Sequence, residues 1–200
     1  AGAAIGYIVH RPLAHNRLYL FAVILIGSWG FTLFNFFGLK NSSRFTAFGV
    51  TIGTIIPGIF LIVLSLSWVF GGHPTQIALH WKDIIPTTFN IDKLAFLVAL
   101  FMAFSGLEVS AAHIRHVNTP KKNYPEAISI TVVIGFTIYI LGALSLAVLI
   151  PRDQISFVSG LIEGFDLFLG NFHLHWLFIP IALMIFLGSI SELNAWIIGP

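Results

Sequence analysis

Long apolar stretches alternate with shorter polar segments along the whole chain. A helix needs ~20 mainly apolar residues to cross the ~30 Å hydrocarbon core of a bilayer. Several stretches approach or reach that length, and the segments between them carry most of the charges and several prolines. The pattern predicts transmembrane helices at residues 18–38, 48–70, 94–112, 125–150 and 176–198.

Two further apolar segments are too short to cross a membrane on their own. Residues 1–9 have the composition of the end of a preceding helix. The stretch 155–169 is interrupted by Glu163 and Asp166, which makes it too short and too charged to span, so we expect an interfacial helix there. Because the sequence opens on alanine instead of methionine and stops directly after an apolar run, we expect residues 1–200 to be a fragment of one transmembrane domain.

Prolines and basic residues refine the boundaries of the predicted helices and their orientation in the membrane. Pro125 followed by Glu126 is typical of the first turn of a helix, and Pro151 ends the same apolar run. Lys and Arg are equally numerous in the two sets of alternate loops, but the loops at 39–46 and 113–124 are much shorter. Since the positive-inside rule holds best for short loops, we expect these two loops to lie in the cytoplasm.

Composition agrees with a bilayer as the surrounding solvent. Hydrophobic residues make up 57% of the chain and charged residues 9%, with a mean hydropathy of +0.93, which leaves too little polar surface for a soluble globule. The ten Lys and Arg residues are scattered over loops without the basic stripe that nucleic acid binding needs. The absence of cysteine excludes disulfides and thiolate chemistry.

The third predicted span contains an acid, Glu108, close behind Gly106. A charged side chain near the bilayer centre costs at least ~2.5 kcal/mol, so such acids usually face a cavity, a partner or a proton path. The glycine and its small neighbours give the backbone freedom to unwind, and broken helices of this kind offer free backbone groups to a substrate at mid-membrane. The alternative is that Glu108 is a protonated packing acid and that the glycine merely allows close helix packing.

The residues around this acid resemble a known family. Residues 104–112 read FSGLEVSAA and residues 117–127 read VNTPKKNYPEA, which resembles the sixth helix and following loop of the amino acid, polyamine and organocation transporter superfamily. Within it, the chain is most similar to the glutamate/γ-aminobutyrate antiporters of bacterial acid resistance. The likeness continues through 147–151 and 187–200, whereas before about residue 94 it rests on hydropathy and order alone.

The resemblance implies an all-α polytopic membrane protein built on LeuT-like inverted repeats, of which this fragment would carry helices four to eight and the end of helix three. Substrate would lie between the broken first and sixth helices. The first helix is absent, so only the sixth-helix half of that site can be matched to this chain. The implied substrate-binding residues are Met102, Phe104, Ser105, Gly106, Leu107 and Ser110.

The resemblance also assigns roles to individual positions. Met102 occupies the position where arginine/agmatine exchangers carry a gating tryptophan, which argues against that substrate. Glu108 matches an acid implicated in proton sensing or gating, and Glu192 matches an acid of the eighth helix.

Glu192 is also a candidate on its own evidence, because Gly188 and Asn194 are among the small and polar residues around it in an otherwise apolar helix. We hypothesise that Glu108, Glu192 or both titrate in the acidic range and couple pH to transport. A buried interhelical hydrogen bond is the alternative for Glu192. The pairs His113/His116 and His173/His175 lack a third ligand, so we expect no metal and no cofactor.

The resemblance implies a pH-dependent antiporter that exchanges glutamate for γ-aminobutyrate across the bacterial inner membrane, with protons and lipid as partners and a homo-oligomer left open. A proton-coupled symporter or an exchanger of another amino acid remains an alternative. A channel would need a continuous ring of polar pore residues, and a membrane-embedded enzyme would need a nucleophile paired with a histidine within a span. The spans contain neither pattern.

Overall fold

The computed structural model describes residues 2–10, 12–13, 16–36, 38–77, 98, 101, 105–106, 110–111, 114–115, 117–151 and 159–198. Over these ranges the chain is helical and contains no strand. Four helical stretches are long and apolar enough to cross a membrane: Arg17–Asn35, Asn41–Phe70, Pro120–Leu149 and His175–Ile197. The all-helical membrane class predicted from the sequence is confirmed. Most of the predicted span 94–112 lies outside the described residues.

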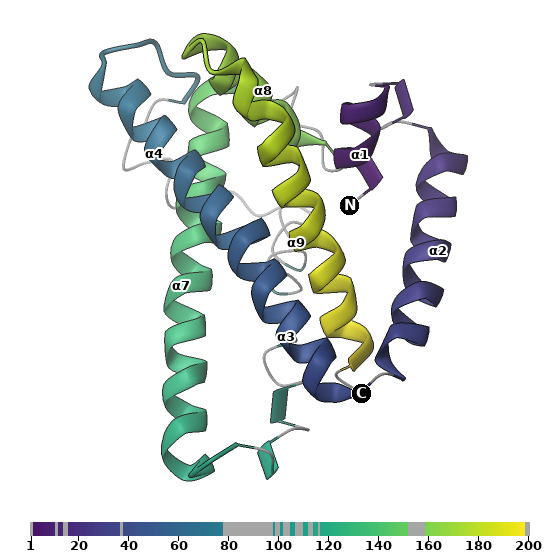
Figure 1. Ribbon diagram of the computed structural model, residues 1–200. Coiled ribbons are helices and arrows are strands. Elements are labelled where there is room, and N and C mark those ends of the chain that lie inside the picture. Colours follow the sequence, from purple (N-terminus) through teal and green to yellow (C-terminus); the bar gives the residue numbers. More distant parts are fainter. Residues whose placement is uncertain are drawn as a thin grey trace.

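The helices occur in the order α1 (Gly2–Val9), α2 (Arg17–Asn35), α3 (Leu39–Val50), the π-helix η2 (Thr51–Ile55), α4 (Ile56–Phe70), α7 (Pro120–Leu149), α8 (Gly160–Asn171), the 3₁₀ turn η5 (His175–Leu177) and α9 (Phe178–Ile198). Figure 1 shows that α3, η2 and α4 run end to end as one long element. Helix α9 packs against α1, α2, α3 and η2, and α7 packs against α4.

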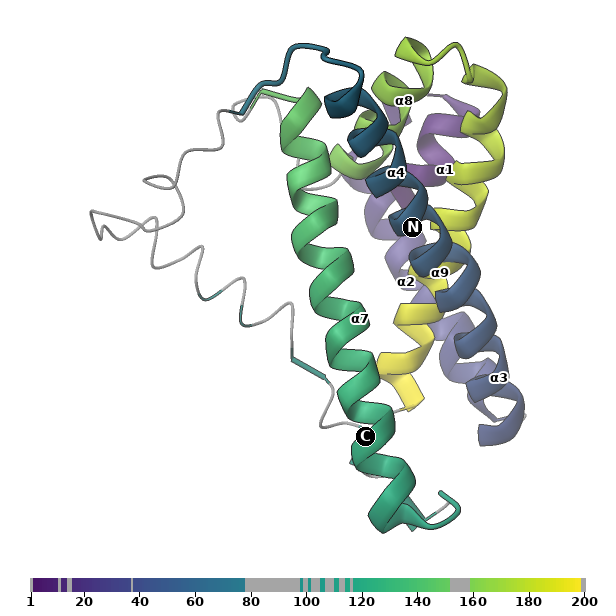
Figure 2. The same cartoon turned by 90° about the vertical axis from the view of Figure 1, so that its left-hand side faces the viewer.

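The helices define two ends of the molecule. The starts of α3 and α7 and the end of α9 lie at one end, and α8 lies at the other with the end of α4, as both Figure 1 and Figure 2 show. The first end carries Arg44, Lys121 and Lys122, which are exposed. In the orientation expected from the sequence, this end faces the cytoplasm.

The structure extends two helices beyond their apolar runs. Helix α7 begins at Pro120 instead of Pro125, because Thr119 adopts a left-handed conformation with φ of +50° and Pro120 takes the first-turn position that suits proline. Pro125 lies inside the helix. Helix α3 covers much of the segment 39–46 that we expected to be a loop, starting after Gly38 with φ of +100°. Hydropathy locates the lipid-facing part of a helix and misses a polar end that continues it.

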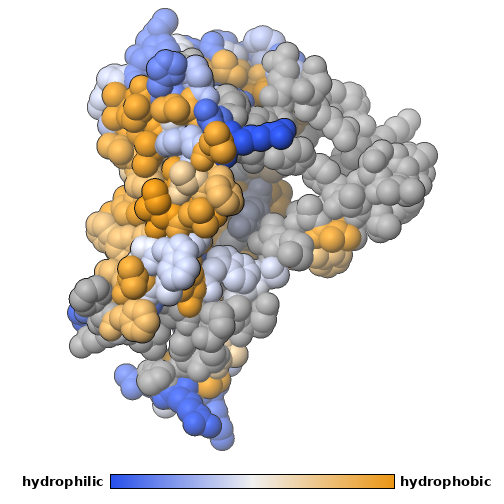
Figure 3. Space-filling view, turned by 90° about the vertical axis from the view of Figure 1, so that its right-hand side faces the viewer, coloured by the Kyte–Doolittle hydropathy of each residue, from blue (hydrophilic) through white to orange (hydrophobic). Residues whose placement is uncertain are grey.

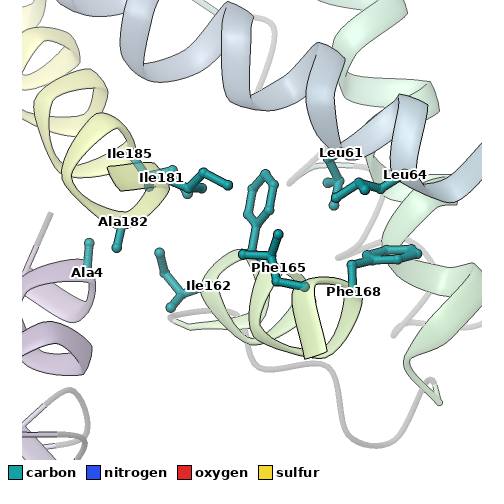
Figure 4. Close-up of a cluster of buried hydrophobic side chains, with 10 residues drawn as sticks. Ala4, Leu61, Leu64, Ile162, Phe165, Phe168, Ile181, Ala182 and Ile185 are labelled. Atoms are coloured by element: carbon teal, nitrogen blue, oxygen red, sulfur yellow. The ribbon is translucent and has the colours of Figure 1, made fainter. Parts of the chain in front are cut away.

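Helix α8 is the segment where we expected an interfacial helix at 155–169, and the structure places it at Gly160–Asn171. Its apolar face is fully buried and, with residues of α1, α4 and α9, forms the main hydrophobic cluster (Figure 4). The spacing of the buried side chains of α8 is that of one helix face. These are Ile162, Phe165, Phe168 and Leu169, and Phe165 stacks on Phe60 of α4 with ring centroids 6.4 Å apart.

The outer surface is apolar between two hydrophilic ends. Helix α2 contains no buried residue and exposes large side chains such as Phe21, Ile26 and Trp29. The space-filling view in Figure 3 shows apolar residues gathered over the middle of this face and hydrophilic residues at its top and bottom. That distribution is typical of a surface in contact with lipid.

Candidate functional site

The centre of the molecule contains a close crossing between η2 and α9. Gly53 is buried there, and a β-carbon added to it would collide with the backbone nitrogen of Gly188. A β-carbon on Gly188 would lie 2.6 Å from the carbonyl carbon of Gly53. Two glycines that meet in this way allow backbone-to-backbone approach, which is the usual device for tight helix packing in membranes. The crossing therefore fixes the register of η2 on α9.

Glu192 lies one helical turn beyond Gly188, on the part of α9 next to this crossing. Its side chain is exposed, and Thr54, the residue after Gly53, donates a hydrogen bond from Oγ1 to Glu192 Oε1 at 3.3 Å. Tyr139 of α7 lies within electrostatic range of the same carboxylate. The hydroxyl of η2 is therefore bonded directly to the acid.

One part of the predicted substrate-binding segment reaches the same helix. Ser105 and Gly106 form a turn, and Gly106 has φ of +101°, a conformation that favours glycine. A β-carbon on Gly106 would lie 3.0 Å from Cη2 of Trp196, which follows Glu192 by one turn of α9. The turn and the acid therefore share one face of α9.

The remaining predicted site residues are placed only in part. Ser110 Oγ and Tyr124 Oη are 3.0 Å apart and share a hydrogen bond, which ties the segment to the start of α7. Met102, Phe104, Leu107 and Glu108 lie outside the described residues.

The opposite side of α9 carries a buried polar network. Asn194 is fully buried, and its Nδ2 donates to Ser42 Oγ at 2.8 Å and to Thr46 Oγ1 at 2.9 Å, both on α3. Ser42 in turn donates to Asn35 of α2. Asn194 Oδ1 and the hydroxyl of the neighbouring Ser191 are buried without a hydrogen-bond partner among the described residues. This network joins α2, α3 and α9 on the side of α9 opposite Glu192.

A second acid is held at the α8 end. Glu163 Oε1 accepts hydrogen bonds from Tyr7 Oη and from Ser159 Oγ, each 2.6 Å long. The bond from Tyr7 connects α1 with α8, elements far apart in the sequence. Glu163 therefore anchors α8 on α1, beside the hydrophobic cluster.

Sequence reasoning did not identify Thr54, Tyr139 or Trp196 as site residues. Thr54 offered one signal, because it is a polar residue between Gly53 and Pro57 in an apolar span, where a helix irregularity is common. Tyr139 and Trp196 offered none, since aromatic residues are frequent throughout the chain.

The histidine pairs do not form a metal site in the described part of the chain. His173 and His175 are both exposed, and the described residues contain no group of three side chains able to hold a metal ion. His113 and His116 lie outside that part.

Comparison with known proteins gives matches along the whole chain. The family profile described as amino acid permease matches residues 1–200. An uncharacterized transporter of Legionella pneumophila is 33% identical over 199 residues, covering 99% of this chain and 42% of the relative. A glutamate/gamma-aminobutyrate antiporter of Lactococcus lactis subsp. cremoris is 31% identical over 200 residues, covering 98% of this chain and 40% of the relative.

A probable agmatine/putrescine antiporter of Lactococcus lactis subsp. lactis is similar over a shorter region. It is 25% identical over 146 residues, which cover 72% of this chain and 31% of the relative. The chain spans about two fifths of the length of the first two relatives.

Proposed function

Because the chain belongs to the amino acid permease family and is part of an integral membrane protein, we propose that the protein exchanges glutamate for γ-aminobutyrate across the bacterial inner membrane in a pH-dependent manner. Amino acid transport follows from the family. The choice of substrates rests on the resemblance of residues 104–112 and 117–127 to glutamate/γ-aminobutyrate antiporters and on the 31% identity to one of them.

The observation that carries the proposal is the shared face of α9. The glycine turn at Gly106 packs beside Trp196, and Glu192 lies one turn away on the same helix. In other transporters an interrupted helix is where substrate is held at mid-membrane. An acid close to such a turn is suited to sense protons or to respond to a charged substrate.

We assign the substrate-binding role to the segment that contains this turn and the gating role to the two acids. Glu108 and Glu192 would couple pH to exchange, with Glu108 taking its role from the resemblance and Glu192 also from its contacts. The substrate-binding set comprises Met102, Phe104, Ser105, Gly106, Leu107 and Ser110.

Uptake into proteoliposomes tests the proposal. The full-length protein is reconstituted, and uptake of labelled glutamate at pH 5 is measured with and without γ-aminobutyrate inside. We expect uptake to require the internal amino acid. Equal uptake into empty vesicles would indicate a uniporter or a proton symporter, and absence of uptake would redirect the search to other amino acids.

The role of the acids is tested separately by their amides. We expect Glu108→Gln and Glu192→Gln to change the pH dependence of exchange between pH 5 and pH 8, because an amide cannot bind or release a proton in this range. Both variants should be expressed and purified in detergent as the wild type is. A pH profile identical to that of the wild type in both variants would refute proton coupling through these residues.

A further inference from the structure

The hydroxyl of Thr54 behaves differently from the hydroxyls of four other threonines in the described helices. In Thr32, Thr51, Thr131 and Thr137 the hydroxyl donates back to the carbonyl four residues earlier in its own helix, each time at 2.8 Å. This is the usual behaviour of threonine inside a helix. Thr54 instead donates across to another helix.

The local backbone explains the difference. Thr54 lies inside the π-helix η2, whose first residue, Thr51, still bonds back to Ala47 of α3. The π-helix ends with the amide of Ile56 bonded to the carbonyl of Thr51. A π-turn changes the carbonyl pattern around the residues that it contains and often occurs at functional positions. Its neighbour Gly53 contributes no side chain at the crossing, and a β-carbon on Gly188 would lie 2.9 Å from Thr54 Oγ1. The hydroxyl is therefore held directly on the surface of α9.

We propose that Thr54 is a positioning residue that holds the Glu192 carboxylate at the crossing of η2 and α9 during exchange. The π-helix brings the hydroxyl to α9, the glycine pair fixes the register, and the hydrogen bond selects the side-chain conformation of Glu192. Tyr139 of α7 is the titratable side chain within electrostatic range of this carboxylate. The inference rests on the proposed function, since it assigns a supporting residue to the same acid.

Three substitutions separate this role from a general effect on the helix. Thr54→Val keeps the branched shape and removes the donor, and Thr54→Ser keeps the donor. Thr137→Val on α7 is the matched control, because its hydroxyl bonds only its own helix. An ordinary intramolecular hydrogen bond has a net contribution whose loss corresponds to about three- to tenfold in rate.

The first measurement is the kinetics of glutamate/γ-aminobutyrate exchange in proteoliposomes. We expect Thr54→Val to lower the maximal rate about three- to tenfold with little change in KM, and to alter the pH profile. Thr54→Ser and Thr137→Val should match the wild type. In a Glu192→Gln background, Thr54→Val should have a much smaller effect. Full activity of Thr54→Val, or an undiminished effect in the Glu192→Gln background, would overturn the proposal.

A second measurement is independent of transport. The thermal midpoints of the wild type, Thr54→Val, Glu192→Gln and the double variant form a thermodynamic cycle in detergent. We expect the two substitutions to be non-additive because they remove the same hydrogen bond. Additive effects would overturn the contact itself. Absence of exchange by the wild type together with non-additive midpoints would refute the proposed function, and the transport role of Thr54 with it, but not the contact.

Discussion

The close crossing of η2 and α9 predicts that a single methyl group at its centre is harmful. We consider Gly188→Ala, which adds a β-carbon facing η2. It would lie 2.6 Å from the carbonyl carbon and 2.7 Å from the carbonyl oxygen of Gly53, and 2.9 Å from Thr54 Oγ1. Two of these atoms belong to the backbone of η2, so no side-chain rotation can relieve those two contacts. The helices must separate or shift along each other.

The magnitude follows from two opposing terms. Carbon atoms pack best at ~3.5–4.0 Å, so the two helices must separate by roughly 1 Å. Overpacking of this kind typically costs ~1–3 kcal/mol, whereas glycine-to-alanine replacement in a helix interior gains up to ~1 kcal/mol. Because backbone atoms cannot move aside locally, we expect the upper part of that range for the cost. The net loss of unfolding free energy should be about 2 kcal/mol.

The assay is the thermal midpoint of the purified protein in detergent at a fixed scan rate. Gly135→Ala and Gly142→Ala on α7 are the controls, since no atom lies within 4 Å of the β-carbon that either would add. We expect both controls to equal or exceed the wild-type midpoint and Gly188→Ala to fall clearly below it. A midpoint for Gly188→Ala as high as that of the controls would refute the close crossing and the register that it gives to Thr54 and Glu192.

Three further substitutions test other contacts. Asn194→Ala removes a buried amide that hydrogen-bonds α3, so the thermal midpoint of this variant should fall by an amount equivalent to about 1–3 kcal/mol. Ser129→Ala is the control, because the Ser129 hydroxyl bonds its own helix, and it should leave the midpoint unchanged. Equal midpoints for the two variants would contradict the network. Tyr7→Phe removes one hydrogen-bond donor to Glu163 and should lower the thermal midpoint by an amount equivalent to about 1 kcal/mol. An unchanged midpoint would argue against the anchoring of α8. Gly106→Ala places a β-carbon at a positive φ, which costs about 1–2 kcal/mol. We expect this variant to be expressed normally and to exchange amino acids more slowly. Full activity would contradict a role for the turn at Gly106.

The helical class could be predicted from the sequence because lipid imposes a simple requirement. Every membrane-crossing segment must satisfy its own backbone hydrogen bonds, so apolar runs of sufficient length are helices. The ends of the helices were predicted less well. The start of α7 at Pro120 depends on the left-handed backbone of Thr119, which has no signature in hydropathy. The same limit applies to α3, whose first turns are polar.

The candidate site was predictable only where a residue type was unusual for its surroundings. Glu192 stood out as an acid in an apolar helix, and Gly106 as a glycine before another acid. Thr54 is a polar residue in an apolar span, but its bond to Glu192 could not be predicted, because the partner lies 138 positions away and the π-helix has no recognised sequence signal. The bond between Tyr7 and Glu163 spans 156 positions and is equally invisible to local pattern. Long-range pairs of this kind depend on the packing of helices, which hydropathy does not describe.

We infer that this family member exchanges one amino acid for another and that acid pH controls the exchange. The most direct measurement is labelled glutamate uptake by the full-length protein in proteoliposomes loaded with γ-aminobutyrate, compared with empty vesicles, at pH 5 and at pH 8. We predict uptake only into loaded vesicles and only at pH 5. Equal uptake into loaded and empty vesicles, or exchange that is unchanged at pH 8, would contradict the claim.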